Sequence, residues 1–283
     1  MIRIVEVGPR DGLQNEISLI STATKIAFVN ALSAAGAAEI EASAFVSPRW
    51  VPQLADAEAV FAGITRRPGV VYSALVPNEH GLDRALAARA EKIAVFTAAS
   101  ETFNRKNINA TIDESIARFV PVARRAREAH LPLRGYVSTA FWCPYEGKIA
   151  PARVVPVIDR LFALGIEEVS IGDTIGKATP DDVAALLDLL LARFPAACLA
   201  LHFHDTYGHA AANVRAAHAR GIETFDSSAG GIGGCPYAPG ASGNIATELL
   251  VDTLAAAGAA VDIDRDALAR ASALIGAALG PRG

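Results

Sequence analysis

The sequence predicts an α/β protein of the closed (β/α)8 class, a TIM barrel, with an extra helix after the barrel. Short apolar runs alternate with longer Ala- and Leu-rich segments of helical period, and the chain holds eight such pairs. No Pro- or Ser-rich linker and no run of like charges interrupts this alternation. Polar residues gather where the predicted strands end, which is where barrels of this class place their active sites.

The predicted strands begin almost at the N-terminus, where residues 2–8 read IRIVEVG. The expected strand ranges are 2–8, 37–43, 69–76, 91–98, 131–140, 166–173, 197–205 and 222–230. Eight helices are expected between and after them, at about 22–36, 54–65, 78–89, 113–129, 151–164, 180–194, 209–220 and 244–258. A further helix is expected at about 265–279.

Several of the predicted helices begin at capping residues. Ser21 precedes the first helix, Thr111 or Asp113 the fourth, and Thr179 followed by Pro180 the sixth. A doubly wound open sheet is the alternative architecture for such an alternation of strands and helices.

With these elements, the barrel covers about residues 2–260 and the extra helix about 264–280, so we expect a single domain over residues 1–283. Hydrophobic residues make up 52% of the chain, which is enough for a large core. The net charge of −4 and the absence of a basic tract argue against a nucleic-acid partner. No apolar run reaches the ~18 residues that span a membrane, so no membrane partner is expected.

The three cysteines, Cys143, Cys198 and Cys235, are odd in number and far apart in the sequence. This pattern argues against a disulfide framework and for a reducing compartment. No signal peptide precedes the first predicted strand. We therefore expect a cytoplasmic, bacterial protein, although a processed organellar protein would look similar.

His202 and His204 lie two residues apart on the seventh predicted strand, so both side chains leave the same face. A single barrel histidine is more often structural, but a pair at the C-terminal end of a strand favours metal binding. Asp11, after the first strand, and Asn244, after a glycine-rich loop, would add a carboxylate and a carboxamide. This mixed set suits Mg²⁺ or Mn²⁺ and does not exclude Zn²⁺ or Co²⁺.

Asp11 and Asn244 each have a second interpretation. The dipeptide of Arg10 and Asp11 is also typical of a solvated loop, although the glycines around it hold the backbone close to the barrel mouth. Asn244 opens the eighth predicted helix, so its alternative role is that of a helix N-cap.

Two acidic residues stand at the ends of apolar strands, where a buried and unpaired carboxylate is costly. Pairing with Arg10 would stabilise Glu41 and orient the guanidinium. Asp173 needs a comparable partner, for which we expect a metal-bound water or a substrate hydroxyl. The surrounding GDTIG (172–176) is also typical of a simple strand-to-helix turn.

Cys235 lies in the segment GGIGGCPYAPGASGN (230–244), where six glycines surround it. This loop has neither the lysine of a P-loop nor the context of a dinucleotide-binding motif. We interpret it as a lid that carries a thiol over the site and closes on the substrate. Cys143 lies in a loop after the fifth strand, and its role stays open.

Six segments together resemble the 3-hydroxy-3-methylglutaryl-CoA lyase family, which belongs to the metal-dependent barrels that make or break carbon–carbon bonds beside acyl groups. The segments are VGPRDGLQNE (7–16), SAFVSPRWVPQ (43–53), RGYVSTAFWCPYEGKI (134–149), GDTIG (172–176), HFHDTYG (202–208) and GGIGGCPYAPGASGN (230–244). The resemblance extends from about residue 3 to residue 258, and the Arg-Asp motif combined with the cysteine-bearing loop is highly specific. Ile17 is a departure, because some relatives have a lysine there that would contact a coenzyme A phosphate.

The resemblance implies a divalent cation, Mg²⁺ or Mn²⁺, held by Asp11, His202, His204 and Asn244. The catalytic residues that it implies are Arg10, Glu41, Asp173, His202 and Cys235. The residues that it places near the substrate are Arg10, Gln14, Tyr136 and Ser138. The expected substrate is a small-molecule acyl-CoA, and we expect a homodimer.

The implied reaction cleaves 3-hydroxy-3-methylglutaryl-CoA to acetoacetate and acetyl-CoA. Arg10 would stabilise the thioester enolate, a role worth ~3–4 kcal/mol in comparable sites. His202, Asp173 or both would accept the proton of the C3 hydroxyl. Cys235 would complete the reaction by giving or taking a proton, and the sequence leaves both directions open.

Other functions fit parts of the pattern. A lyase for a longer 3-hydroxy-3-alkylglutaryl-CoA or a related acyl-CoA condensing enzyme would share the site, but no long regulatory domain follows the barrel. Zinc hydrolase barrels usually carry the histidine pair on the first strand, and zinc thiolate methyltransferases need adjacent cysteines in the glycine loop. A non-catalytic binding barrel is the remaining alternative.

Overall fold

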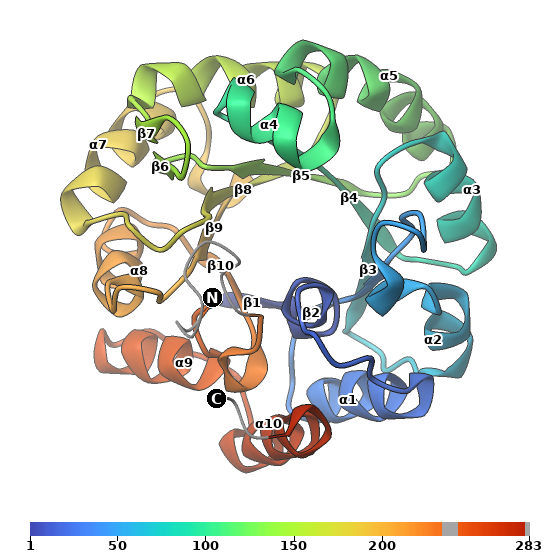
Figure 1. Ribbon diagram of the computed structural model, residues 1–283. Coiled ribbons are helices and arrows are strands. Elements are labelled where there is room, and N and C mark those ends of the chain that lie inside the picture. The colour runs from blue at the N-terminus through green and yellow to red at the C-terminus, as the bar shows by residue number, and fades with distance from the viewer. Residues whose placement is uncertain (234–242, 281–283) are drawn as a thin grey trace.

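All eight predicted strands form, and they close into one parallel barrel (Figure 1). The structure is a computed structural model that describes residues 1–233 and 243–280. The barrel strands are β1 (Arg3–Glu6), β2 (Glu39–Ala44), β3 (Val71–Leu75), β4 (Lys92–Ala98), β5 (Leu133–Ser138), β8 (Glu168–Asp173), β9 (Leu199–Phe203) and β10 (Thr224–Ser227). They follow one another around the barrel in chain order, and β10 pairs with β1 to close it. The expected fold class is therefore confirmed.

Helices surround the strands, as the view along the barrel shows (Figure 1). The helices that connect or follow the strands are α1 (Thr22–Ala34), α2 (Ala57–Gly63), α3 (Glu79–Ala87), α5 (Ile112–Glu128), α6 (Pro151–Ala163), α7 (Pro180–Leu191), α8 (Ala210–His218) and α9 (Thr247–Ala256). The extra helix is α10 (Arg265–Leu279), which packs against α1 outside the barrel. Within the described ranges, no helix is both long enough and apolar enough to cross a membrane.

The predicted capping residues begin their helices for the expected physical reason, because each satisfies a backbone amide in the first turn. Ser21 accepts a hydrogen bond from the amide of Thr24 at 3.2 Å. Thr111 and Thr179 each form a reciprocal capping box with the acidic residue three positions later.

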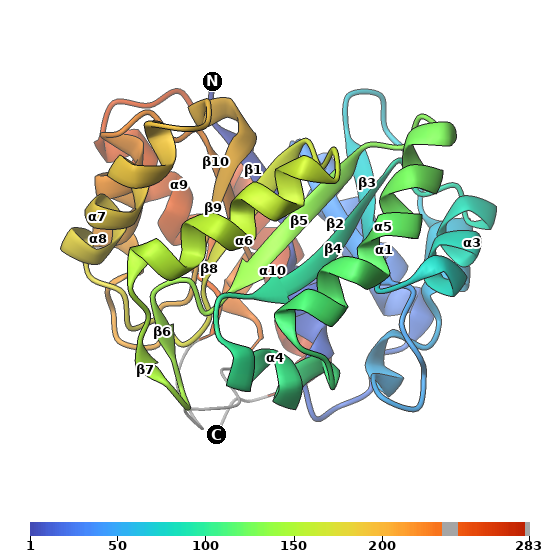
Figure 2. The same ribbon diagram turned by 90° about the horizontal axis from the view of Figure 1, so that it is seen from above.

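Three local features of the barrel mouth differ from the expectation. The short helix α4 (Glu101–Ile108) follows β4 directly, and the strands β6 (Trp142–Cys143) and β7 (Gly147–Lys148) form a small hairpin after β5. Figure 2 shows this hairpin and α4 at the same end of the barrel. A π-helical turn, Gly8–Gly12, follows β1. Each follows the C-terminal end of a barrel strand, so together they shape the rim of the site.

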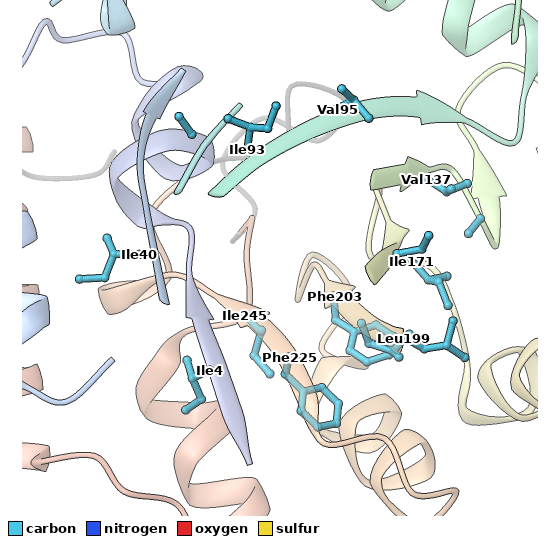
Figure 3. Close-up of a cluster of buried hydrophobic side chains, with 14 of the residues drawn as sticks. Ile4, Ile40, Ile93, Val95, Val137, Ile171, Leu199, Phe203, Phe225 and Ile245 are labelled. Atoms are coloured by element: carbon cyan, nitrogen blue, oxygen red, sulfur yellow. The ribbon is translucent and has the colours of Figure 1, made fainter. Parts of the chain in front are cut away.

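Side chains alternate along the barrel strands between two environments. One set is apolar and forms the core between strands and helices, and Figure 3 labels its members Ile4, Ile40, Ile93, Val95, Val137, Ile171, Leu199, Phe203 and Phe225. Ile245, which precedes α9, belongs to the same core. The alternate set points into the barrel. This inward set includes the buried charged residues Glu39, Lys92, Arg134 and Asp226. The barrel interior is therefore unusually polar beneath the mouth.

Candidate active site

The turn after β1 fixes the positions of Arg10 and Asp11 at the barrel mouth. The carbonyl oxygen of Val7 accepts hydrogen bonds from three successive amides, those of Arg10, Asp11 and Gly12, at 3.1, 2.7 and 3.2 Å. This bonding produces the π-helical turn, a feature that is frequent at functional sites.

Arg10 connects this turn to Glu41 in the middle of β2. Its Nε donates to Oε2 of Glu41 at 2.5 Å, and its Nη1 donates to Oδ1 of Asp11 at 2.6 Å. Arg10 is 6% exposed and Glu41 is 1% exposed, so their charges interact where water screens them little. The pairing of Arg10 with Glu41 that the sequence suggested is present.

Asp11, His202 and His204 bring three potential metal-ligand atoms within 4.8 Å of one another. His202 lies on β9, and His204 follows it on the same face. Asp11 reaches them from the turn after β1, and its Oδ2 lies 3.8 Å from Nε2 of His202. One carboxylate and two imidazoles at this spacing suit a divalent cation.

The protonation states of Asp11 and His204 fit a cation. Burial and the neighbouring His202 lower the pKa of His204 to about 4, so that its ring is neutral near pH 7. Burial favours a neutral Asp11, but Arg10, His202 and His204 outweigh it and lower the pKa of Asp11 to about 2. Metal ligands must be deprotonated. In addition, Nδ1 of His204 is buried without a hydrogen-bond partner among the described residues, which leaves a lone pair for a ligand bond.

Asn244 is a fourth polar side chain in this group. Its Nδ2 donates to Oδ2 of Asp11 at 2.9 Å, and its backbone bridges to His204. The expectation that Asn244 opens the following helix is wrong, because α9 begins at Thr247 and Ala246 is the N-cap residue. The N-cap interpretation of Asn244 is thereby removed, and its amide faces the candidate ligands instead.

A cavity of about 400 Å³ opens beside these residues at the barrel mouth. Its walls include Arg10, Asp11, His202 and His204, together with the predicted substrate-binding residues Gln14, Tyr136 and Ser138. Trp50, which is 86% exposed, and Phe103 also line it. The structure therefore brings the predicted metal ligands and substrate-binding residues to one opening.

Two predicted catalytic carboxylates, those of Glu41 and Asp173, are not among the described residues that line the cavity. Glu41 lies behind Arg10, which pairs with it and lines the cavity. Asp173 accepts hydrogen bonds from the backbone amides of Lys177 and Ala178 at 3.1 and 3.0 Å. These amides are the partners of Asp173 among the described residues, and the alternation along β8 places position 173 on the side away from the barrel interior. The expected contact with a metal-bound water or a substrate hydroxyl stays a prediction. Burial nevertheless raises the pKa of Asp173 to about 7.

Asp226 on β10 holds the His202 ring from behind, although the sequence did not single it out. Nδ1–H of His202 donates to Oδ2 of Asp226 at 3.2 Å, which leaves Nε2 facing Asp11. Asp226 also accepts hydrogen bonds from Nη2 of Arg134 and Oγ of Ser170, at 2.6 and 2.7 Å. A carboxylate in this position fixes the tautomer and orientation of a metal-binding imidazole.

The predicted role of Cys235 falls on residues 234–242, outside the part of the chain that the structure describes. It stays a prediction. Cys143 is buried, and its Sγ lies 3.1 Å from Oγ of Ser100.

Taken together, the fold and the site define a (β/α)8 barrel with a candidate divalent-metal centre and a buried arginine at its C-terminal mouth. The chain belongs to the HMGL-like family, whose model matches residues 1–275.

Named relatives agree with this assignment. The chain is 50% identical over 279 residues to the hydroxymethylglutaryl-CoA lyase of Pseudomonas mevalonii, covering 99% of this chain and 93% of the relative. The crystal structure of HMG-CoA lyase from Brucella melitensis superposes with a TM-score of 0.95 at 52% identity and covers 97% of both chains. An HMG-CoA lyase from Acinetobacter baumannii, solved in complex with coenzyme A and 3-methylmalate, has a TM-score of 0.93 at 40% identity and covers 99% and 91% of the two chains.

Proposed function

We propose that the protein is a divalent-metal-dependent carbon–carbon lyase that cleaves 3-hydroxy-3-methylglutaryl-CoA to acetoacetate and acetyl-CoA. The observation that carries the proposal is the adjacency of Arg10 and Asp11 in one turn. Arg10 pairs with Glu41 on one side, and Asp11 meets His202 and His204 on the other. The names of the relatives support this activity, and the coenzyme A complex of the Acinetobacter structure supports an acyl-CoA substrate.

The reaction needs two charges to be handled at neighbouring atoms. The bond between C2 and C3 breaks, the C3 hydroxyl loses its proton as a ketone forms, and C2 leaves as the enolate of a thioester. Asp11, His202, His204 and Asn244 would hold the cation, which when bound supplies Lewis acidity to the hydroxyl oxygen. Arg10 donates hydrogen bonds to the thioester oxygen and stabilises the enolate charge, which in comparable sites is worth ~3–4 kcal/mol.

Two groups near the site are proposed as proton acceptors. Burial raises the pKa of Asp173 to about 7, a range that suits a general base near neutral pH, but Asp173 is not among the described residues that line the cavity, so it would act on the hydroxyl only through an intervening group. Burial opposes the charged form of His202, but the hydrogen bond to Asp226 and the charge of Asp11 outweigh it and raise the pKa of His202. The predicted acceptors of the hydroxyl proton are His202 and Asp173. A His202 that binds the cation through Nε2 and donates Nδ1–H to Asp226 has no free lone pair, so His202 would take this proton only while Nε2 is not bound to the cation. The final proton transfer at C2 is assigned to Cys235.

The test is direct turnover by the purified protein. With Mg²⁺ or Mn²⁺ and the CoA thioester, it should release equal amounts of acetoacetate and acetyl-CoA, and excess EDTA should stop the release. The variant His209→Gln controls for the substitution of a histidine outside the site, and it should keep the parental turnover. His209 is the N-cap residue of α8, and its side chain makes no capping hydrogen bond. Absence of both products with every divalent cation tried would overturn the proposal.

A panel of CoA thioesters with longer alkyl groups at C3 decides between this substrate and its longer homologues. The reverse assay, with acetyl-CoA and a keto acid, tests the condensing alternative. The comparisons do not favour either alternative. The homodimeric state stays a prediction, which size-exclusion chromatography with light scattering would test. The cytoplasmic location stays a prediction too, which cell fractionation would test.

A further inference from the structure

Beneath the cavity, the barrel interior holds a network of six charged side chains, of which five are buried and Arg3 is 34% exposed. Its members are Arg3, Glu39, Lys92, Arg134, Glu168 and Asp226. With three cations and three anions, the network is electrically balanced. Such a ladder of ion pairs is costly to bury and contributes little net stability compared with an apolar core. A role in the function of the site would explain its presence.

Arg134 is the cation of this network that contacts both Asp226 and Tyr136. It is 1% exposed, and its guanidinium makes two hydrogen bonds and one ion pair, each with a different partner. Nε lies 2.8 Å from Oε1 of Glu168, Nη2 donates to Oδ1 of Asp226 at 2.6 Å, and Nη1 donates to Oη of Tyr136 at 3.1 Å. Arginine is suited to this, because its planar fork holds several partners in one fixed geometry.

The contact to Asp226 continues to the candidate metal centre. Asp226 accepts from Arg134 with one oxygen and from Nδ1 of His202 with the other. The guanidinium therefore fixes the plane of the carboxylate, and the carboxylate fixes the ring. The remaining nitrogen of His202 is directed at Asp11.

The contact to Tyr136 continues to the predicted enolate-stabilising group. Oη of Tyr136 donates to Oε2 of Glu41 at 3.3 Å, the same oxygen that accepts from Nε of Arg10. Both guanidinium groups also lie over the Tyr136 ring, with Cζ of Arg134 at 4.9 Å and Cζ of Arg10 at 5.3 Å from its centroid. A shift of Arg134 would therefore displace Arg10, because both guanidinium groups pack on the Tyr136 ring and Tyr136 shares the Glu41 carboxylate with Arg10.

We propose that Arg134 is a positioning residue that sets two halves of the site at once, His202 through Asp226 and Arg10 through Tyr136. The inference rests on the proposed function for its catalytic readout, but its metal-binding readout is independent of turnover. Substituting Arg134 should therefore change both metal binding and turnover. Substituting Asp226 should change metal binding, and substituting Tyr136 should change turnover alone.

Lys92 provides the matched comparison for a purely structural role. It is a buried cation of the same network, and its Nζ contacts Glu39 at 2.9 Å and Glu168 at 3.2 Å. It has no hydrogen bond to Asp226 or Tyr136 among the described residues. Removing either cation leaves the network with an excess negative charge. Only the loss of Arg134 also removes the hydrogen bonds to Asp226 and Tyr136.

The experiment compares Arg134→Gln, Asp226→Asn, Tyr136→Phe and Lys92→Gln with the parent protein. The Kd for Mn²⁺ is measured by electron paramagnetic resonance, and kcat and KM are measured at saturating Mn²⁺. Losing the outer partner of a metal ligand usually weakens metal binding 10- to 100-fold, and Asp226 is that partner of His202. Because Arg134 acts through Asp226, Arg134→Gln should weaken Mn²⁺ affinity by up to this factor and lower kcat. Asp226→Asn should weaken Mn²⁺ binding, Tyr136→Phe should lower kcat at an unchanged Kd, and Lys92→Gln should leave the Kd for Mn²⁺ unchanged.

A double-variant cycle tests whether Arg134 acts through Asp226. In the Asp226→Asn background, Arg134→Gln should weaken Mn²⁺ binding no further, because the path is already broken. Additive losses, or a folded Arg134→Gln that binds Mn²⁺ like the parent, would overturn the proposal.

If Arg134→Gln does not fold, the double variant Arg134→Gln/Asp226→Asn removes the carboxylate charge that is left unpaired. Asp226→Asn then tests the contact to His202, and Tyr136→Phe tests the contact to Arg10. An unchanged Mn²⁺ affinity in Asp226→Asn or an unchanged kcat in Tyr136→Phe contradicts the proposal. A parent protein that binds Mn²⁺ but releases no acetoacetate contradicts the proposed function alone, since the ratios of Kd still test the positioning role.

Discussion

Nε of Arg10 and Oε2 of Glu41 are 2.5 Å apart, so the turn after β1 and the middle of β2 are joined by a buried charged hydrogen bond. The guanidinium also lies over the ring of Tyr136. These contacts hold the group in one orientation at the cavity wall before a substrate arrives. Donors that need no rearrangement during the reaction stabilise developing charge most effectively.

Replacing Arg10 should therefore affect turnover much more than folding. We expect Arg10→Gln to lower kcat by about 10²- to 10³-fold, the usual loss for one preorganised donor to an oxyanion. Arg10→Lys should recover only part of it, because an ammonium group keeps the charge but not the fork that spans Glu41 and Asp11. Steady-state kinetics and circular dichroism give the two readouts.

The control for Arg10→Gln addresses the carboxylate that it strands. Glu41 is buried, and an unpaired charge there would destabilise the fold. The double variant Arg10→Gln/Glu41→Gln removes that charge, so it should recover stability while kcat stays low. Near-parental kcat in Arg10→Gln would contradict the enolate role.

Substituting His202 or His204 should weaken metal binding, whereas substituting a histidine outside the site should not. We expect His202→Gln and His204→Gln each to weaken Mn²⁺ binding by more than the 10- to 100-fold typical of outer partners, because each removes a direct ligand. Thermal unfolding gives a second readout, since a cation at 100 times its Kd stabilises the folded state by about 2.7 kcal/mol. Added Mn²⁺ should raise the Tm of the parent and of His209→Gln. An equal rise in the His202→Gln and His204→Gln variants would exclude this site.

The sequence predicted the features that depend on local pattern. Eight strands, their helices and the facing pair of His202 and His204 follow from periods of 3.6 and 2. The charge of Glu41 at the end of an apolar strand also required a nearby cation, and Arg10 provides it. Such inferences need only one strand or two neighbouring strand ends.

Asp226 and Arg134 were missed because their roles depend on tertiary contacts. They lie 92 residues apart in the sequence and meet only inside the closed barrel. The available signal was the alternation on each strand, since Arg134 shares a face with Tyr136, and Asp226 shares one with Thr224. Asp173 shows the converse, because the same alternation places it away from the barrel interior.

Gly233 should prove sensitive to the addition of a single methyl group. Its φ is +98°, and a Cβ there would lie 2.8 Å from Cα of Gly12 and 2.9 Å from Nδ2 of Asn244. Gly233→Ala should therefore push Asn244 away from Asp11 and weaken Mn²⁺ binding. Gly208→Ala is the matched control, because its φ is +73° but no atom lies within 4 Å of its Cβ. It should lose about 1 kcal/mol of stability from the backbone strain alone and keep the parental Kd. Equal Kd values for both variants would contradict the contact.

Glu6 should make the stability of the protein depend on pH. Its carboxylate is 1% exposed and accepts hydrogen bonds from the amides of Gly8 and Ala229 and from Oγ1 of Thr247. Burial outweighs these bonds and raises the pKa of Glu6 from 4.5 to about 7. The folded state then binds this proton more tightly than the unfolded state does. The resulting stability is fully present below about pH 4.5 and is lost as the pH rises through about 7.

Glu6→Gln isolates this contribution, because the amide resembles the protonated acid and does not titrate. At about 1.4 kcal/mol for each unit of pKa, the free energy of unfolding of the parent should fall by roughly 3 kcal/mol relative to Glu6→Gln between pH 4.5 and pH 7.5. Asp173, whose pKa is also raised to about 7, is present in both proteins and cancels in the difference. Urea unfolding across this range provides the measurement, and a constant difference at all pH values would show that folding does not raise the pKa of Glu6.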